Sequence, residues 1–174
     1  NGDDLVDFGL RVQNAGANMI CIHARTYMEP YKVAPQYEQV YALKDALSIP
    51  VIGNGGIESL EDGERYCSRL DGFYIGQATF GNPWIFVGEK PRYLKDRLPV
   101  ILNHAQYLIE HKGERVGTRE IRKHILAYVK GVHGAKPYKK YLSTVESLDQ
   151  IKTLLTETAD VEFQFYSERD LVVA

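Results

Sequence analysis

The stretch from residue 48 to residue 86 carries two glycine-rich turns, and it constrains the fold more than any other part of the chain. Each turn follows a short apolar run typical of a strand and precedes a segment typical of a helix. The first turn is GNGG at residues 53–56, and the second begins at Gly76. This order predicts parallel strands joined by helices. Because parallel strands end at one edge of a sheet, we expect the N–H groups of both turns to form an anion site, most often for phosphate.

A third strand end lies earlier in the chain. The apolar run MICI at residues 19–22 follows a helix-type pattern that ends at Gly16, and it leads into His23 and Arg25. These two side chains are one residue apart, so a strand pleat is expected to point both the same way. A phosphate or the edge of a flavin ring would suit the pair. The alternative is a histidine at the sheet edge and an arginine that forms a salt bridge with a neighbouring helix.

The residues of the two turns also allow two interpretations. Asn54, Gly55 and Gly56 are typical of a tight turn, but a second glycine turn one strand later favours a phosphate site. Gln77, directly after Gly76, is expected either to donate its side-chain amide to an anion or to be a solvated surface residue.

Helix signals follow each turn. Ser59 is predicted to be an N-cap with Asp62 in a capping-box position, and Asn82-Pro83 is predicted to begin another helix with Asn82 as its cap. Residues 27–35 are predicted to form a loop, and helical spacing resumes from Tyr37.

After residue 86 the pattern predicts helices without strands. A charged linker is expected near residues 90–98, flanked by Pro91 and Pro99. It divides the chain into domains 1–90 and 91–174. Three helices are expected in the second domain: one on an apolar stripe that begins at Ile101, one capped by Thr118, and one that begins at Ser147. Residues 160–174 receive no assignment.

The second domain contains a strongly basic segment. Residues 112–140 carry nine basic and two acidic side chains, although the net charge of the whole chain is −2. On the second predicted helix, Arg119, Lys123 and Lys130 fall in one sector with Arg122 beside them, opposite the apolar stripe and without an acid. We expect this sector to contact a nucleic-acid backbone, and Lys139 and Lys140 to extend it. The alternative is an ordinary solvated helix face.

The remaining composition is that of a globular chain, with 44 % hydrophobic and 25 % charged residues. No apolar run is long enough to span a membrane and no secretory signal is recognisable, so a cytoplasmic protein without membrane partners is expected. Cys21 and Cys67 are predicted to be buried free thiols. The histidines show no spacing suited to a metal, and no metal site is predicted.

Four segments together resemble one family: HARTYMEPY, SIPVIGNGGI, GFYIGQATFGNPWIF and REIRKHILAYVKG. They resemble the C-terminal half of the tRNA-dihydrouridine synthases, flavoenzymes that reduce uridines of tRNA. The resemblance implies an FMN-binding (β/α)8 TIM barrel followed by a helical tRNA-binding domain. The implied fold class is therefore α/β, with the last three βα units of the barrel followed by an all-α bundle.

The resemblance also implies roles for particular residues. His23 matches a histidine that reaches the flavin, the turn at residues 54–56 matches the FMN phosphate turn, and Gly76 matches the next phosphate turn. The family usually has arginine where this chain has Gln77, which implies weaker phosphate binding. A basic pattern of the family's helical domain implies tRNA contacts at Arg119, Arg122, Lys123, His124, Lys130 and Gly131.

The implied reaction passes hydride from NADPH to FMN and then to the uracil ring, while a cysteine donates a proton. In the family that cysteine lies in the N-terminal half of the barrel, and neither Cys21 nor Cys67 matches it. The chain alone is therefore expected to be inactive. Two alternatives stay open: another FMN-binding or phosphate-binding barrel oxidoreductase, similar to dihydroorotate dehydrogenase, and a non-catalytic RNA-binding module.

Overall fold

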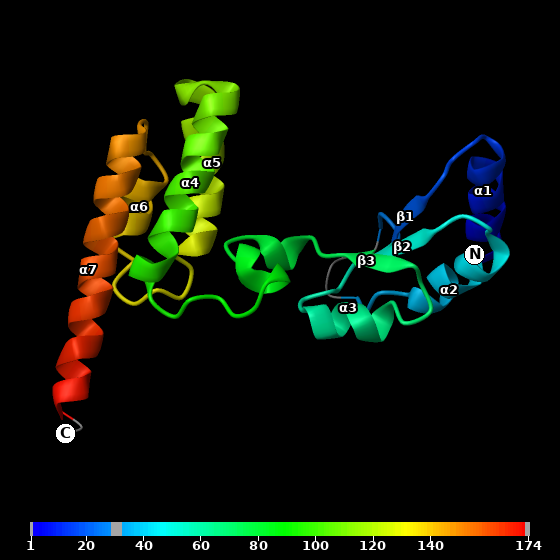
Figure 1. Ribbon diagram of the computed structural model, residues 1–174, viewed down its shortest axis with the longest axis horizontal. Helices are drawn as coiled ribbons and strands as arrows, with labels where there is room; N and C mark the ends of the chain where they lie inside the picture. The colour runs from blue at the N-terminus through cyan, green and yellow to red at the C-terminus, as the bar shows by residue number, and fades with distance from the viewer. Residues whose placement is uncertain (1, 29–32, 173–174) are drawn as a thin grey trace. The chain divides into compact units, whose positions relative to one another are not determined.

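The computed structural model describes residues 2–28 and 33–172 (Figure 1). The chain forms two compact units, residues 1–79 and residues 80–174. The first unit contains a parallel sheet with helices, and the second is helical. The sequence placed a domain boundary near residue 90, and that functional division stays a prediction.

The first unit is built on three parallel strands in the order β1-β2-β3. In the register of the sheet, Ile20 pairs with Val51, and Ile52 pairs with Gly72. The α/β fold class predicted from the sequence is confirmed, and three consecutive parallel strands are consistent with part of a TIM barrel. The elements are α1 (Gly2–Asn14), β1 (Ile20–His23), α2 (Tyr37–Ala46), β2 (Val51–Asn54), α3 (Leu60–Tyr66) and β3 (Gly72–Tyr74).

Helix α2 and the end of α3 cover one face of the sheet. In β2, Gly53 is buried, whereas Ile52 and Asn54 on the opposite face are partly exposed. A Cβ atom at Gly53 would lie 2.8 Å from the sulfur of Cys67 and 3.1 Å from the ring of Tyr37. Glycine at this position therefore lets both helical segments approach the strand closely.

The start of α3 follows the sequence prediction. The hydroxyl of Ser59 accepts a hydrogen bond from the Asp62 N–H at 3.0 Å. The carboxylate of Asp62 accepts from the N–H of Glu58 at 3.3 Å, one residue before the position that a standard capping box uses.

The segment after β3 differs from the prediction. It forms two short 3₁₀ helices, η1 (Gln77–Thr79) and η2 (Pro83–Phe86), in place of a regular helix from Asn82. Pro83 does lie in the first turn of η2, but the side chain of Asn82 makes no capping hydrogen bond. Gly81 has φ +67°, and a Cβ atom there would lie 2.4 Å from the Ala127 carbonyl. The chain thus turns against the backbone of a later helix.

The helical unit is built from helices that pack around one apolar core. Helix α4 packs against both α5 and α7, and α6 packs against α5 and α7 (Figure 1). Gly117 permits the close approach of α4 and α5, because a Cβ atom there would lie 2.6 Å from the backbone of Leu108 and Ile109. The four helices are α4 (Leu94–Lys112), α5 (Glu114–Tyr128), α6 (Tyr138–Leu142) and α7 (Leu148–Val172).

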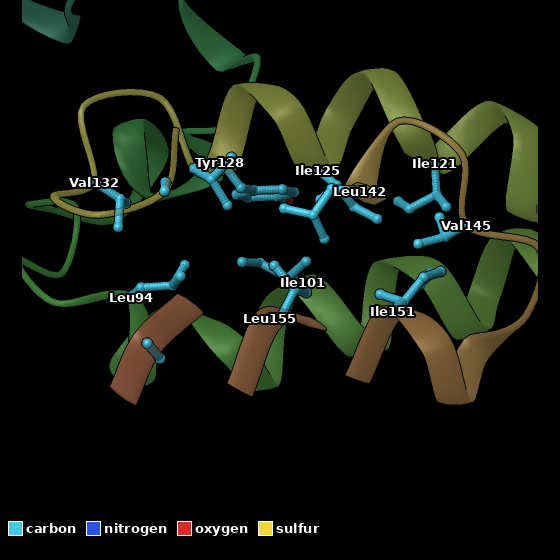
Figure 2. Packing of buried hydrophobic residues seen from close by; sticks show 14 residues of the cluster. Leu94, Ile101, Ile121, Ile125, Tyr128, Val132, Leu142, Val145, Ile151 and Leu155 are labelled. Carbon is cyan, nitrogen blue, oxygen red and sulfur yellow. The ribbon is translucent and has the colours of Figure 1, made fainter. Parts of the chain in front are cut away.

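The core of this unit consists of the apolar stripes that the sequence predicted. Ile101 from α4, Ile121 and Ile125 from α5, and Ile151 and Leu155 from α7 are all 0 % exposed. Figure 2 shows their side chains meeting between the helices. Burial of a side chain of this size contributes roughly 1.5–3 kcal/mol, so these stripes are the main source of the unit's stability.

The predicted linker is wrong from residue 94 onward, because α4 begins there and includes Pro99. A buried carboxylate determines this start: Glu162 of α7, 4 % exposed, accepts the N–H of Leu94 at 2.6 Å. Arg97, 8 % exposed, donates to the carbonyls of Pro91 and Arg92, each at 2.6 Å. The preceding segment is therefore held against the helix by contacts that local sequence does not reveal.

Two further helix ends differ from or extend the prediction. Helix α5 begins at Glu114 after Gly113, so Thr118 lies inside the helix and is not its cap. At α7 the Ser147 N-cap is confirmed, since the N–H of Gln150 donates to the hydroxyl of Ser147 at 3.2 Å. As at α3, the return bond is displaced by one residue, because the side chain of Gln150 accepts from the N–H of Glu146 at 2.8 Å. The helix then continues to residue 172, which makes most of the unassigned C-terminal stretch helical.

Both cysteines are free, as predicted. Cys67 is buried, but Cys21 is exposed, so the prediction of burial is wrong for Cys21. In the register Cys21 pairs with Ile52, on the face of the sheet opposite the buried Gly53, so α2 and the end of α3 do not cover it. No helix in the described ranges combines the length and the apolarity that crossing a bilayer requires.

Two histidines face each other in the helical unit. The ring centroids of His104 and His124 are 4.8 Å apart, and Nδ1 of His104 lies 3.3 Å from the Tyr128 hydroxyl. Phe80 stacks on His124. Burial lowers the pKa of both imidazoles, and the nearby charges of His104 and Lys123 lower the pKa of His124 further.

We predict that the helical unit loses stability as the pH falls from about 7 to about 5. Histidine in the unfolded chain titrates near pH ~6.5, and both folded pKa values are lower, so the unfolded state binds more protons in this range. The stabilisation is complete above pH ~6.5 and is lost as the pH falls through the folded values. Urea unfolding at a series of pH values measures this effect.

The control separates this pair from other titrating groups. His104→Gln should flatten the dependence of unfolding free energy on pH, whereas His111→Gln, at an exposed histidine on the same helix, should leave it unchanged. Identical slopes for His104→Gln and the unaltered chain would contradict the prediction.

Candidate functional site

The side chain of Asn54 connects the ends of all three strands. Its Oδ1 lies 2.6 Å from Nδ1 of His23 at the end of β1, and its Nδ2 donates to the carbonyl of Tyr74 in β3 at 3.1 Å. Because the amide oxygen only accepts, Nδ1 of His23 carries the hydrogen. The second ring nitrogen, Nε2, makes no protein contact among the described residues.

The turn that follows β2 requires its glycines. Gly55 and Gly56 have φ values of +109° and +70°, which side chains disfavour. A Cβ atom at Gly55 would lie 2.8 Å from the ring of His23, and one at Gly56 would lie 2.8 Å from Pro35. Because both residues are glycines, no side chain covers the backbone of this turn.

A buried tyrosine orients this turn. The hydroxyl of Tyr37 donates to the carbonyl of Gly55 at 2.9 Å, and its ring stacks on Tyr66 with centroids 4.9 Å apart. Burial raises the pKa of Tyr37, so the phenol stays a donor. In a trans peptide the C=O and the next N–H point in opposite directions. Since the Gly55 carbonyl points to Tyr37, the N–H of Gly56 points away from it.

These groups surround one hollow of about 620 Å³. All seven residues that the sequence predicted as cofactor contacts line it, although they come from three strand ends. The predicted residues are His23, Arg25, Asn54, Gly55, Gly56, Gly76 and Gln77, and the hollow is completed by Ile57, Glu58, Tyr74 and Ala78.

The donors of this hollow suit an anion. Within residues 2–28 and 33–172, the backbone N–H groups of Gly55, Gly56, Gly76 and Gln77 donate to no protein group. Arg25 is fixed by a hydrogen bond from Nε to the Val33 carbonyl at 2.7 Å, which leaves its terminal nitrogens for a ligand. Free N–H groups on bare glycine backbone and a fixed guanidinium are the donor set that phosphate groups use.

The second glycine turn is stabilised by hydrogen bonds of its own. Both the N–H and the hydroxyl of Thr79 donate to the carbonyl of Gly76, at 3.1 and 2.7 Å. A Cβ atom at Gly76 would meet nothing within 4 Å, so this glycine leaves open space beside the hollow.

The sequence did not single out three residues that shape this site: Tyr37, Glu58 and Tyr74. Tyr74 is 58 % exposed between two more buried neighbours, and the alternation of Phe73, Tyr74 and Ile75 along the strand was the available signal. Nothing in the local sequence indicates that Tyr37 reaches Gly55, because the two are distant in the chain.

The predicted basic sector is only partly formed by α5. Arg119 and Lys123 are exposed on the helix, but α5 ends at Tyr128, so Lys130 lies beyond it. Arg122 donates from Nε and Nη2 to the Val145 carbonyl, at 2.9 and 2.6 Å. Arg122 therefore fastens the loop before α7 to α5.

The other predicted cations and the neighbouring acids complete this surface. Lys139 and Lys140 are exposed on α6. The expectation of a sector without acids is wrong, because Glu114 and Glu146 line a hollow together with Arg119. Glu120, next to Arg119, is paired with Lys112 at 2.7 Å, which lowers the pKa of Glu120.

Comparison with known proteins identifies the family. A profile described as dihydrouridine synthase matches residues 1–164 of the chain. The chain therefore belongs to the dihydrouridine synthase family, whose members are flavin oxidoreductases that use FMN. This finding confirms the resemblance and favours it over a dihydroorotate-dehydrogenase-like protein.

Individual relatives agree with this assignment. A protein of Aquifex aeolicus named probable tRNA-dihydrouridine synthase is 29 % identical over 161 residues, which cover 88 % of this chain and 51 % of the relative. tRNA-dihydrouridine synthase B of Pseudomonas aeruginosa is 32 % identical over 170 residues, which cover 90 % of this chain and 49 % of the relative. The chain thus spans about half the length of these relatives.

We predict that Gly55→Ala destabilises the first unit through two separate effects. The positive φ costs roughly 1–3 kcal/mol for alanine, and the added methyl displaces the His23 ring. Gly16→Ala is the matched control, since Gly16 has φ +101° but no atom within 4 Å of its Cβ position. Urea unfolding should show a larger loss for Gly55→Ala, and an equal loss in both variants would contradict the role of the His23 contact.

Proposed function

We propose that the hollow at the carboxyl ends of the three strands binds the phosphate end of FMN. One observation carries this proposal: residues predicted separately from three strand ends all line the same hollow. The free N–H groups of the two glycine turns, the Arg25 guanidinium and the Gln77 amide would donate to the phosphate. His23, oriented by Asn54, would contact the cofactor through Nε2.

We further propose that the reaction is the reduction of uridine to 5,6-dihydrouridine in tRNA, with NAD(P)H as the reductant. FMN supplies the hydride chemistry when it is bound, and this chain supplies part of its binding site. Neither Cys21 nor Cys67 matches the position of the cysteine that the family resemblance implies as proton donor. We therefore expect no turnover from this chain alone.

The helical unit is proposed to bind the tRNA backbone. The exposed cations Arg119 and Lys123 lie on α5, Lys130 follows it, and Lys139 and Lys140 lie on α6. Arg119 and Lys123 lie about one turn apart on α5, and Lys130 lies beyond its end, so these cations match more than one backbone phosphate. Arg122 contributes by holding the loop beside this surface and adds positive charge to it.

The first prediction concerns the phosphate. FMN should shift the amide resonances of Gly55, Gly56 and Gly76 in a titration of this chain followed by NMR, whereas riboflavin, which lacks the phosphate, should not. Gln77→Arg should tighten FMN binding about tenfold, because a charged donor replaces a neutral one. Equal shifts with both ligands, or FMN shifts confined to residues outside the hollow, would refute the phosphate site.

The second prediction concerns tRNA. Lys123→Ala and Lys130→Ala should each weaken binding and reduce the slope of log K against log salt by roughly one. Lys152→Ala is the control, because Lys152 is an exposed lysine on α7, outside the proposed surface. If Lys152→Ala lowers the slope as much as the other two, binding follows net charge alone, and the assigned surface is wrong.

A further inference from the structure

A second hollow lies in the helical unit, beside the first turns of α5. It has a volume of about 290 Å³ and is formed by one stretch of α5 and one residue of the loop before α7. Its lining residues are Glu114, Arg115, Thr118, Arg119, Arg122 and Glu146. Its size lies just below the roughly 300–1,000 Å³ of most ligand pockets, so it fits a small group such as a single nucleotide.

A buried hydroxyl in this lining has no partner. Thr118 is 1 % exposed, and its Oγ1 makes no hydrogen bond with any group in the described part of the chain. Threonine inside a helix commonly donates to the carbonyl four residues earlier, as Thr156 and Thr158 do on α7 at 2.9 and 2.7 Å. The Oγ1 atom itself has less than 1 Å² of accessible surface, so it lies behind the wall of the hollow and does not face its interior.

The wall opposite α5 is held in place. Arg122 binds the carbonyl of Val145, and the N–H of Glu146 donates to the side chain of Gln150 at 2.8 Å. Both contacts hold the peptide group between Val145 and Glu146, directly before the Glu146 side chain. The carboxylate itself is exposed and forms no ion pair with a described residue.

The charges around this hollow have both signs. Arg115 and Arg119 are exposed and lie beside Glu114 and Glu146, yet no ion pair joins these four among the described residues. A bare phosphate would be attracted by the arginines and repelled by the carboxylates. A nucleotide satisfies both, because its phosphate accepts from arginine and an amino group on its base donates to a carboxylate.

We propose that this hollow takes one unpaired nucleotide of the bound RNA and prefers a base with an exocyclic amino group to uracil. This inference rests on the proposed tRNA binding and adds a base-reading element to it. Arg115 and Arg119 hold the phosphate, and Glu146 accepts from the base amino group. Single-stranded regions of RNA present such unpaired base edges to proteins.

The test compares two RNA tetranucleotides, CCCC and UUUU, whose bases have the same size but differ in the amino group. Binding is followed by NMR through the amides of Thr118 and Glu146. The cytidine tetramer should bind about tenfold more tightly, and Glu146→Gln should bring the two affinities together. Glu157→Gln, at an exposed glutamate on α7 outside the hollow, should keep the difference.

Several results would overturn the inference. Equal affinity for the two tetramers would do so, as would tighter binding of both by Glu146→Gln with the preference unchanged, which would make Glu146 only a source of repulsion. Whole tRNA is measured in parallel. If tRNA binds while the tetramers bind without discrimination or not at all, only this inference fails. If tRNA does not bind, the proposed function of the helical unit fails first, and this inference falls with it.

Discussion

The hydrogen bonds of the Asn54 side chain are the interaction on which the first unit's site depends. The side-chain amide of Asn54 accepts from His23 and donates to the carbonyl of Tyr74. It therefore joins the ends of three parallel strands that are neighbours in the sheet. The next residues then need positive φ values and bare backbone, because the His23 ring lies where a Cβ atom of Gly55 would be. The buried Tyr37 hydroxyl fixes the peptide that follows. The free N–H groups are a consequence of this network.

The helical unit depends on a different constraint, a buried pair of charged groups near the start of α4. Glu162 satisfies the first N–H of the helix, and Arg97 satisfies three carbonyls, those of Pro91, Arg92 and Tyr128. Both side chains are almost fully buried, so leaving either partner unsatisfied would be costly. Glu162 joins α7 to the start of α4, and Arg97 joins α4 to the preceding segment and to the end of α5. The cations Arg119, Lys123, Lys139 and Lys140 on α5 and α6 stay exposed. The charges that stabilise the unit, on Glu162 and Arg97, are therefore buried, whereas the charges available to a ligand lie on the surface.

Local chemistry made much of this predictable. The glycine turns, the strand ends, the Ser147 N-cap and the apolar stripes are signals within a few residues, and the structure contains them where the sequence placed them. The errors came from distant contacts. Pro99 lies in α4, whose first N–H is bound by Glu162 of α7. Helix α5 ends before Lys130, and Cys21 lies on the face of the sheet that the helices do not cover. The positions of Tyr37 beside Gly55 and of Glu146 in the hollow with Arg119 likewise depend on residues that are distant in the chain.

The most direct test of the central claim is a crystal structure of this chain soaked with FMN. The hydrogen-bond network around Asn54 predicts the FMN phosphate within hydrogen-bond distance of the backbone N–H groups at residues 55, 56 and 76, with His23 still bound to Asn54. A phosphate bound away from both glycine turns, or a turn rearranged so that these N–H groups point elsewhere, would contradict the account.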